Sequence, residues 1–478
     1  MKLFNTLGRR IEELQPLEPG RVGVYACGPT VYQYAHIGNL RTFVFVDLLV
    51  RTLRLFGYGV RHVMNITDVG HLTDDADQGE DKMLKGAREQ GASVWEIARF
   101  YTEAFFRDLK ALNMERPDIV CRATDHIQEM IALIGRIEKA GYAYEAGGNL
   151  YFDVSRLPDY GKLTGQSSAE LMSRLKAGAR IEVDRNKKNP LDFVLWFTRS
   201  KFEHQAMTWD SPWGRGYPGW HIECSAMSMR YLGEQFDIHC GGVDLVPVHH
   251  SNEIAQSEAA TGRKPWVRYW LHGEFLVLAK EKMAKSTGKF LTLGSLREQG
   301  YDPLDYRYLC LGAHYRSQLQ FSFEALDGAR AGRRNLVERI VRLREANEQV
   351  KPAAPESIAG KAAESLEAFK SALADDLNVP RALAVLWDLL KDETVSLPQR
   401  IGAVGVMDRV IGLDLAAVEP QALDPKLVSE IEALVGERQQ ARDRKDYARA
   451  DEIREELRRK GIILEDTPEG VRWRKEIF

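Results

Sequence analysis

The feature of the sequence that most constrains its fold is an apolar run, a long helical pattern and a second apolar run in direct succession. Residues 22–26 read as a short buried strand. Residues 38–56 carry apolar side chains near helical spacing, and residues 60–66 read as the next strand. A strand, a helix and a strand in this order predict a βαβ unit, which requires a parallel sheet with a right-handed crossover. The sequence therefore predicts an α/β fold.

The α/β pattern is interrupted and later resumes. Helical patterns follow at 93–112 and 124–141, and strand-like runs occur at 150–154 and 193–197. The α/β pattern then returns, and 236–239 reads as a central strand. This order predicts that an insertion splits the parallel-sheet domain.

The last third of the sequence is helical and charged. Linkers rich in Pro and Ala interrupt the helical pattern at 351–355 and 418–425. Residues 427–460 read as one charged helical stretch that ends at Gly461, and a hairpin pattern closes the chain. We expect a parallel-sheet domain (1–114 and 211–280), an insertion (115–210), a lysine-loop segment (281–315), a helical bundle (316–415) and a small C-terminal α+β domain (425–478).

Composition excludes several classes of protein. At 478 residues the chain is too long for one core, so we expect three or four domains. Five cysteines is a small, odd number, which favours ligand or catalytic thiols in a reducing cytoplasm over a disulfide framework. No apolar run approaches the length of a membrane span, and no signal-peptide core opens the chain, so we expect a cytoplasmic protein without a membrane partner. The net charge of −3 means that any RNA contact must use local basic patches.

Three residue types suited to a metal ion, Cys, His and Glu, occur at positions that could form a site. Cys27 follows the first strand, Cys224 lies in Gly219-Trp-His-Ile-Glu-Cys224, and His249, His250 and Glu253 lie close together beyond it. Two thiolates, an imidazole and a carboxylate make a tetrahedral set for Zn²⁺. His249 and Glu253 are four residues apart and His250 and Glu253 three apart, so helical spacing alone does not choose between the two histidines. Lone helical histidines are more often structural than metal ligands.

Two further motifs suit a triphosphate. His36-Ile-Gly-Asn39 opens the first long helix, where free N–H groups and the helix dipole favour phosphate, and Gly38 lets a nucleotide approach the backbone. Lys282 and Lys285 lie three residues apart in a polar loop, from which both can stabilise a leaving pyrophosphate. A solvated surface loop is the plainer interpretation of the lysines, and a simple helix start that of the first motif.

Taken together, the motifs resemble those of the cysteinyl-tRNA synthetase family, within the class I aminoacyl-tRNA synthetases. The resemblance covers essentially the whole chain and keeps the family's order. It rests on Tyr25-Ala-Cys-Gly-Pro-Thr-Val-Tyr32, His36-Ile-Gly-Asn39, Asn65-Ile-Thr-Asp68, Pro218-Gly-Trp-His-Ile-Glu-Cys-Ser-Ala-Met227, Asp237-Ile-His239, His249-His-Ser-Asn-Glu253 and Lys282-Met-Ala-Lys-Ser286. The stretch around Cys224 is the most specific of these.

The resemblance implies a fold, a reaction and a set of residues. The fold is a Rossmann-like catalytic domain split by a connective insertion, then a helical domain and an anticodon-binding domain. The reaction is ATP-dependent activation of L-cysteine, with Mg²⁺ accompanying ATP, and transfer of the cysteinyl group to the 3′ end of tRNA(Cys) by a cytoplasmic monomer. The implied residues are Cys27, Cys224, His249 and Glu253 for one Zn²⁺, Thr67, Trp220 and His239 around the substrate cysteine, and His36, Gly38, Asn39, Lys282 and Lys285 for ATP and catalysis.

The zinc ion would explain the choice of amino acid. Size barely separates cysteine from serine and alanine, whereas a thiol near zinc ionises and binds as thiolate. The resemblance also assigns tRNA anticodon contacts to Arg442, Asp446, Tyr447, Asp451 and Asp466. An exposed charged helix is the plainer interpretation of that region.

The sequence departs from the family at several positions, and two alternatives remain open. Ala284 replaces the usual Ser in the lysine loop, and Cys240 beside His239 could bring another thiol to the pocket. One alternative is a ligase that transfers cysteine to a small amine, as mycothiol-pathway relatives do, although these lack a full anticodon domain. The other is a non-catalytic zinc protein that binds RNA, which we expect to have lost its phosphate-binding or metal-ligating residues.

Overall fold

A five-stranded sheet organises the first half of the molecule. The computed structural model describes residues 1–70, 91–167, 170–171, 184–199, 207–278, 291–345, 351–418, 425–467 and 470–475. The sheet contains, in spatial order, β11 (Val267–Gly273), β10 (Phe236–Gly242), β3 (Arg21–Ala26), β4 (Gly59–Ile66) and β5 (Ile119–Arg122), and every neighbouring pair is parallel. The chain builds outward from β3 to β5 on one side and then returns to add β10 and β11 on the other. This is the Rossmann-like order, with its switch point between β3 and β10.

Helices cover both faces of this sheet. One face packs against α1 (Ile37–Leu55) and α3 (Val94–Ala111), and the other against α4 (Ile127–Lys139), α6 (Trp220–Leu232) and α7 (Ser251–Thr261). Side chains along β3 point alternately to the two faces of the sheet, so Val22 and Val24 belong to the first core and Tyr25 to the second. The predicted βαβ unit is therefore confirmed, as is the Rossmann-like fold class.

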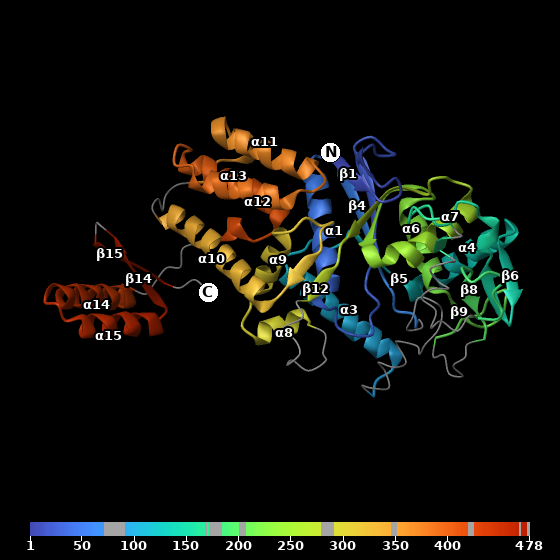
Figure 1. The fold of residues 1–478 in the computed structure, drawn as a ribbon, viewed down its shortest axis with the longest axis horizontal. Helices are drawn as coiled ribbons and strands as arrows, with labels where there is room; N and C mark the ends of the chain where they lie inside the picture. Colours follow the sequence, from blue (N-terminus) through green and yellow to red (C-terminus); the bar gives the residue numbers. More distant parts are fainter. Residues whose placement is uncertain are drawn as a thin grey trace.

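The insertion forms an antiparallel sheet of its own. Its strands are, in order, β6 (Ala143–Ala146), β7 (Asn149–Phe152), β8 (Phe193–Phe197) and β9 (Tyr217–Pro218). Figure 1 shows them beyond α4 and α6, at the end of the molecule farthest from α14. β5 lies within the range 115–210 that we assigned to the insertion, yet it pairs with β4 as the edge of the main sheet. The domain boundaries themselves stay predictions.

A helical region follows the sheet. It contains α8 (Leu293–Glu298), α9 (Pro303–Leu311), α10 (Phe323–Glu345), α11 (Gly360–Ala374), α12 (Val379–Lys391) and α13 (Leu397–Ile411). A hairpin of β1 (Lys2–Asn5) and β2 (Arg10–Glu13) and a parallel pair of β12 (Leu276–Leu278) and β13 (Leu319–Phe321) complete the body. The buried Arg307 of α9 donates to Asp47 of α1 and to the carbonyl oxygen of Ile411 in α13, which ties these helices to the sheet domain.

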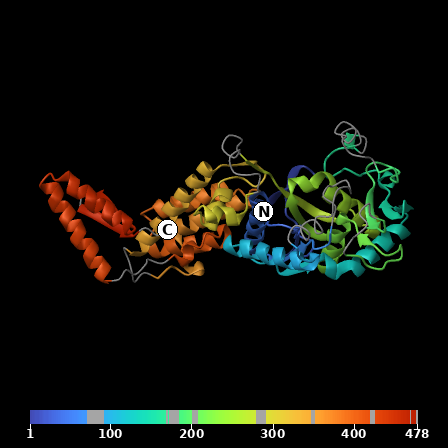
Figure 2. The same cartoon turned by 90° about the horizontal axis from the view of Figure 1, so that it is seen from below.

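The C-terminal region folds around a small core of its own. It comprises α14 (Pro425–Asp443), α15 (Tyr447–Arg459) and an antiparallel pair of β14 (Ile462–Thr467) and β15 (Gly470–Lys475). Figures 1 and 2 show it projecting from the end of the molecule opposite the insertion. The expectation of one helical stretch over 427–460 is wrong. The chain turns at Lys445, whose φ is 63°, and Asp446 then caps the N-terminus of α15.

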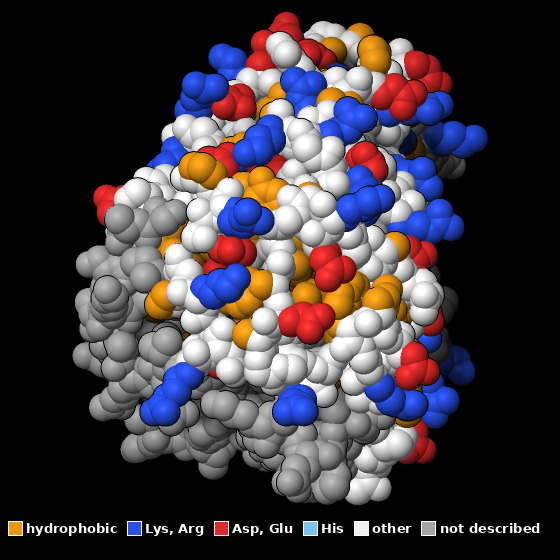
Figure 3. All heavy atoms as spheres, turned by 90° about the vertical axis from the view of Figure 1, so that its right-hand side faces the viewer, with side chains coloured by type: hydrophobic (Ala, Val, Ile, Leu, Met, Phe, Trp, Pro, Cys, Tyr) orange, Lys and Arg blue, Asp and Glu red, His pale blue; other side chains and the backbone are white. Residues whose placement is uncertain are grey.

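Charges of both signs are mixed on the surface. Figure 3, which views the insertion end, shows Lys and Arg interspersed with Asp and Glu around apolar side chains. Within the part of the chain that the structure describes, no helix is both long enough and apolar enough to cross a bilayer.

Candidate functional site

The site lies at the carboxyl ends of β3 and β10, where the sheet order reverses. Open α/β sheets bind ligands at this switch point. Cys27 directly follows β3, and its N–H donates to the carbonyl oxygen of Cys240 at 3.1 Å. A Cβ on Gly28 would lie 1.7 Å from the carbonyl oxygen of Asn65, so glycine is required for this end of β3 to approach β4. The local sequence thus places the Cys27 thiol at the carboxyl end of the central strand.

Four donor groups converge there from four elements. Cys27 comes from the end of β3 and Cys224 from α6, and their sulfur atoms lie 3.7 Å apart. His249 lies in a short π-helical turn, Val246–His250, which leads into α7 and Glu253. His249 Nε2 lies 3.0 Å from Glu253 Oε1, and one ligand atom from each of the four residues lies within 4.8 Å of the others.

This donor set fits a tetrahedral zinc ion. Zn–S bonds of about 2.3 Å at a tetrahedral angle place two sulfurs about 3.8 Å apart, close to the separation of Cys27 and Cys224. The four side chains meet near the carboxyl ends of β3 and β10, and Cys224, His249 and Glu253 are buried. Two soft sulfurs with one nitrogen and one oxygen are a donor chemistry that selects zinc over Mg²⁺ or Ca²⁺.

Electrostatics within the set favour a bound cation. Burial alone would raise the pKa of Glu253, but His239 and His249 outweigh it and lower the pKa to about 2. Burial opposes protonation of His249, yet Glu253 and Cys224 raise its pKa to about 10. Burial raises the pKa of the Cys27 thiol, whereas the pKa of Cys224 is lowered because hydrogen bonds from Cys27 and His249 outweigh burial.

A second histidine approaches the same atoms. His250 Nε2 lies 3.3 Å from the Cys27 sulfur, and Cys27, His239, His250 and Glu253 form an overlapping donor set. A Cβ on Gly241 would lie 2.6 Å from the His250 ring, so this glycine makes room for the imidazole. The choice between His249 and His250, which spacing left open, stays a prediction.

Sequence reasoning missed the histidines that support the set. His221 Nδ1 lies 3.1 Å from His249 Nδ1, and His272 Nε2 lies 2.8 Å from His250 Nδ1. Such partners orient metal-ligating imidazoles and fix their tautomers. They come from α6 and β11, and their only sequence signal was residue type, since the contacts form through tertiary structure.

The three residues predicted to surround the substrate lie at different depths. Trp220 lines an open cleft beside the donor set, and its ring centroid lies 4.4 Å from that of His249. Thr67 is buried and donates to Glu223 at 2.9 Å. His239 is fully buried, with Nε2 2.9 Å from Glu253 Oε2, so its contact with the donor set is through the Glu253 carboxylate. Their substrate roles stay predictions.

The cleft has a volume of about 240 Å³ and reaches the start of α1. Its lining includes Cys27, Thr30, Tyr34, His36, Asn39, Tyr101, Phe105, Trp220 and Asp244. The structure therefore brings the first phosphate motif and the thiols into one cavity. Lys282 and Lys285, together with Ala284, lie outside the described residues.

The side chains of His36 and Asn39 cap the start of α1, so some of the N–H groups that the sequence suggested were free for phosphate are already hydrogen-bonded. His36 Nδ1 accepts from the N–H of Asn39 at 3.1 Å, and the Asn39 side chain accepts from the N–H of His36, which forms a capping box. A Cβ on Gly38 would lie 3.0 Å from the His36 ring, so glycine here lets that ring fold back over the helix start. Burial lowers the pKa of His36, against an opposing effect of Asp244, which favours a neutral ring.

Cys240 does not supply a further thiol to the pocket. Successive strand residues face opposite sides of a sheet, so Cys240 points away from His239. It is fully buried in the apolar core that contains α1, where burial raises its pKa.

The residues predicted to read the anticodon lie together in the C-terminal region. Asp466 on β14 forms ion pairs with Arg438 and Arg442 of α14, each at 2.8 Å. Asp446 caps α15 through the N–H of Arg449, and the neighbouring Tyr447 is 63% exposed. The side chain of Asp451 is also exposed. Their contacts with tRNA stay predictions.

Comparisons with known proteins agree along the whole chain. The family model described as "tRNA synthetases class I (C) catalytic domain" matches residues 13–331, and "Cysteinyl-tRNA ligase anticodon binding domain" matches residues 424–474. The chain is 54% identical to a cysteine–tRNA ligase of Treponema denticola, with 99% of each chain covered. It is 50% identical to cysteine–tRNA ligase 1 of Burkholderia lata, covering 99% of this chain and 96% of the relative. A methionyl-tRNA synthetase of Mycobacterium tuberculosis bound by methionyl-adenylate shares the fold, with a TM-score of 0.56 at 17% identity, covering 83% of this chain and 93% of that one.

Proposed function

The chain belongs to the cysteine–tRNA ligase family of class I tRNA synthetases, and from this premise we propose that it activates L-cysteine with ATP and transfers the cysteinyl group to the 3′ end of tRNA(Cys). The observation that carries the proposal is the convergence of two thiols, His249 and Glu253 beside the cleft that contains His36. Chemistry on a sulfur substrate and chemistry on a nucleotide then share one cavity. ATP, cysteine and tRNA meet in the cytoplasm, where we expect the protein to act as a monomer.

Cys27, Cys224, His249 and Glu253 would hold a zinc ion. When bound there, zinc supplies a Lewis acid that binds a substrate thiolate and discriminates against a hydroxyl or a methyl group. His249 is favoured over His250 because its set contains both sulfurs. His239 and His221 orient Glu253 and His249 through their hydrogen bonds. Trp220 gives the cysteine an apolar wall, and Thr67 is held by Glu223 at the end of β4.

The activation step relies on position and charge. The cysteine carboxylate attacks the α-phosphorus of ATP, and pyrophosphate with its Mg²⁺ leaves. His36 is locked by its capping box with Asn39, so its imidazole faces the cleft in a fixed orientation. Gly38 keeps the helix start accessible at its first turn. Lys282 and Lys285 stabilise the charge that develops on the leaving group.

The role of Lys285 has a direct kinetic test. Lys285→Ala should slow adenylate formation about 100-fold while changing the KM for cysteine much less, because the ammonium acts on the transition state. Single-turnover formation of cysteinyl-adenylate measures the rate. A variant that activates cysteine at the wild-type rate would exclude the lysine from this step.

The overall proposal is tested by metal analysis and pyrophosphate exchange on the same preparation. We expect one zinc per chain and ATP–pyrophosphate exchange with cysteine, but none with serine or alanine. We then expect cysteine to be transferred to tRNA(Cys). Exchange without transfer to tRNA, but with transfer to an amino sugar, would point to the small-amine ligase. Absence of exchange would point to a non-catalytic protein.

A further inference from the structure

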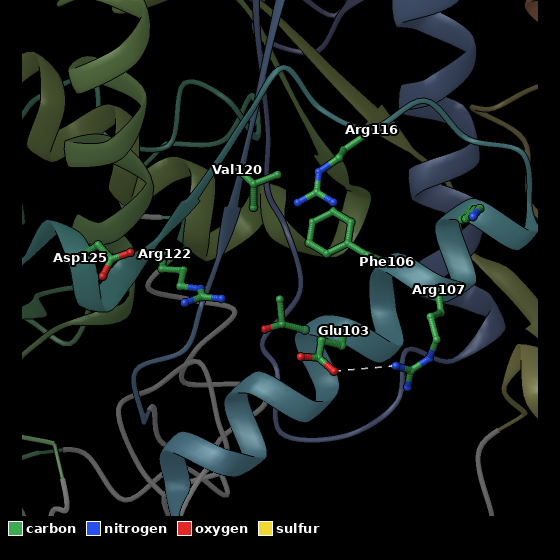
Figure 4. Close-up of a pocket in the computed structure, with 9 residues that line it drawn as sticks. Glu103, Phe106, Arg107, Arg116, Val120, Arg122 and Asp125 are labelled. Carbon is green, nitrogen blue, oxygen red and sulfur yellow. Dashed lines mark ion pairs between the residues drawn. The ribbon is translucent and has the colours of Figure 1, made fainter.

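A second groove lies on the other side of α3 from the nucleotide cleft. It has a volume of about 650 Å³ and runs between α3 and the segment that contains β5 (Figure 4). Tyr101 and Phe105 of α3 line the nucleotide cleft, whereas Thr102 and Phe106 line the groove. The two cavities thus share one helix as their wall.

The groove is locally basic. Its charged lining residues are Arg107, Lys110, Arg116, Arg122, Glu103 and Asp125. Four cations therefore face two carboxylates in a chain whose net charge is −3. Glu103 is already paired with Arg107 at 4.0 Å. Among the described residues, the structure shows no ion pair for Lys110, Arg116 or Arg122, so these cations are available to an anionic ligand.

The side chains are arranged around the groove and not spread over the surface. The Arg116 guanidinium lies over the Phe106 ring, 4.7 Å from its centroid, which holds it at the groove floor. Figure 4 shows Arg116 and Arg122 directed into the groove from the β5 side, opposite Glu103 and Arg107 on α3. Two walls thus present cations to one space.

An exposed aromatic pair lies beside the nucleotide cleft. Phe100 is 45% exposed and Tyr34 is 47% exposed, and their ring centroids lie 6.0 Å apart. Tyr34 also lines the nucleotide cleft. Phe100, Arg107 and Lys110 follow each other at helical spacing along one stripe of α3, about 15 Å from end to end. An aromatic platform at the cleft therefore continues into a line of cations.

We propose that this groove binds the 3′-terminal strand of the tRNA, with a base stacked on Phe100 and Tyr34 and phosphates beside Arg116 and Arg122. Exposed aromatic rings next to cations are the features that bind a single-stranded nucleic acid. Free phosphate would use the cations and leave the rings without a role. The path ends at the cleft in which the cysteinyl group is activated. This inference rests on the proposed function, because it takes tRNA as the ligand.

The phosphate contacts are tested with Arg116→Gln/Arg122→Gln. The control is Arg10→Gln/Arg21→Gln, which removes two exposed arginines that have their own partners, Glu12 and Glu18. We expect the KM for tRNA to rise about tenfold in the groove variant, and the slope of log binding constant against log salt to fall by about 1–2. Cysteine-dependent pyrophosphate exchange without tRNA should stay within about twofold of wild type, and the control should match wild type in every assay.

The stacking contact is tested separately. Phe100→Ala should raise the KM for tRNA about fivefold or more, and Phe100→Tyr should restore it because the ring remains. Unchanged tRNA binding and salt slope in the arginine variant would overturn the inference, as would weaker binding of inorganic pyrophosphate with tRNA unaffected. Binding of an acidic peptide in place of tRNA would also overturn it. Failure of the proposed function is distinct, because wild-type protein would then lack cysteine-dependent exchange.

Discussion

Asp47 and Asp466 each pair with two arginines, but the two carboxylates lie in different surroundings. Asp47, in the catalytic body, lies 2.9 Å from Arg51 and 2.7 Å from Arg307, and its side chain is 3% exposed. Asp466, in the C-terminal region, lies 2.8 Å from Arg438 and from Arg442, and its side chain is 47% exposed. The same type of ion pair therefore connects buried helices in the catalytic body and lies at the surface in the C-terminal region.

The two regions use their charged side chains differently. Arg307 has no access to water, so its charge depends on Asp47 and on the carbonyl oxygens of Leu112 and Ile411. Removing one member of such a network leaves a buried, unpaired charge. Arg442 and Asp466 can exchange each other for water or for the edge of a base at little cost. The body thus uses ion pairs to fix its geometry, while the C-terminal region keeps them available.

The largest expected effect is on stability. Asp47→Asn should lower the free energy of unfolding by about 3–5 kcal/mol, because it leaves Arg307 buried without a counter-charge. The matched variant Asp466→Asn should cost less, about 1 kcal/mol, because water and salt reach the half-exposed carboxylate of Asp466 even though Arg438 is itself buried. Urea titration of both variants measures the difference. Equal losses would show that burial does not separate the two sites.

The second effect is on chemistry within the body. Cys224→Ser should abolish zinc binding and reduce cysteine activation at least about 100-fold, because serine is a poor zinc ligand. Binding of tRNA should be retained, since the C-terminal region is untouched. Zinc content and pyrophosphate exchange are the measurements, and Cys310→Ser, a buried thiol outside both donor sets, is the control. Activation near the wild-type level would exclude Cys224 from the metal site.

The sequence predicted the parts of the fold that have a strong period or a local signal. The helix expected at 38–56 is observed as Ile37–Leu55, and the strand expected at 60–66 as Gly59–Ile66. The sequence did not reveal β5, because Ile119–Arg122 is only four residues long. It also joined α14 to α15, since the break at Lys445 depends on one left-handed residue and the Asp446 cap.

Residue type was enough to identify candidate metal ligands from the sequence, but residue spacing was not enough to choose between them. The two cysteines and the His249–Glu253 segment could be named from their chemistry, and the structure brings them together. Helical spacing could not choose a histidine, and the folded chain places both His249 and His250 within reach. His221 and His272 could not be found, because their contacts exist only once α6, α7 and β11 have packed.

The third effect is confined to the C-terminal region. Asp466→Ala should raise the KM for tRNA about tenfold or less, while cysteine activation without tRNA stays unchanged, which is the reverse of Cys224→Ser. Loss of one polar base contact costs about 1–3 kcal/mol at most sites, and here the exposed Arg442 remains to contact RNA. Aminoacylation kinetics at varied tRNA concentration make the measurement. A loss of activation would mean that the C-terminal region acts on the catalytic body.

The smallest effect is a titration. Hydrogen bonds from Arg438 and Arg442 lower the pKa of Asp466 to about 2, against an ordinary value near 3.9, and the slight burial of the carboxyl only partly opposes them. Because the folded-state pKa is depressed, the ion pairs contribute their stability above about pH 4 and lose it as the pH falls toward 2. NMR titration of the Asp466 carboxyl carbon should give this midpoint, and Arg438→Gln should raise it more than Arg442→Gln, since Arg438 forms the stronger interaction. A wild-type midpoint near 3.9 would mean that Arg438 and Arg442 do not hold Asp466 in solution, so Asp466 and Asp47 would share a geometry but not its energetic effect.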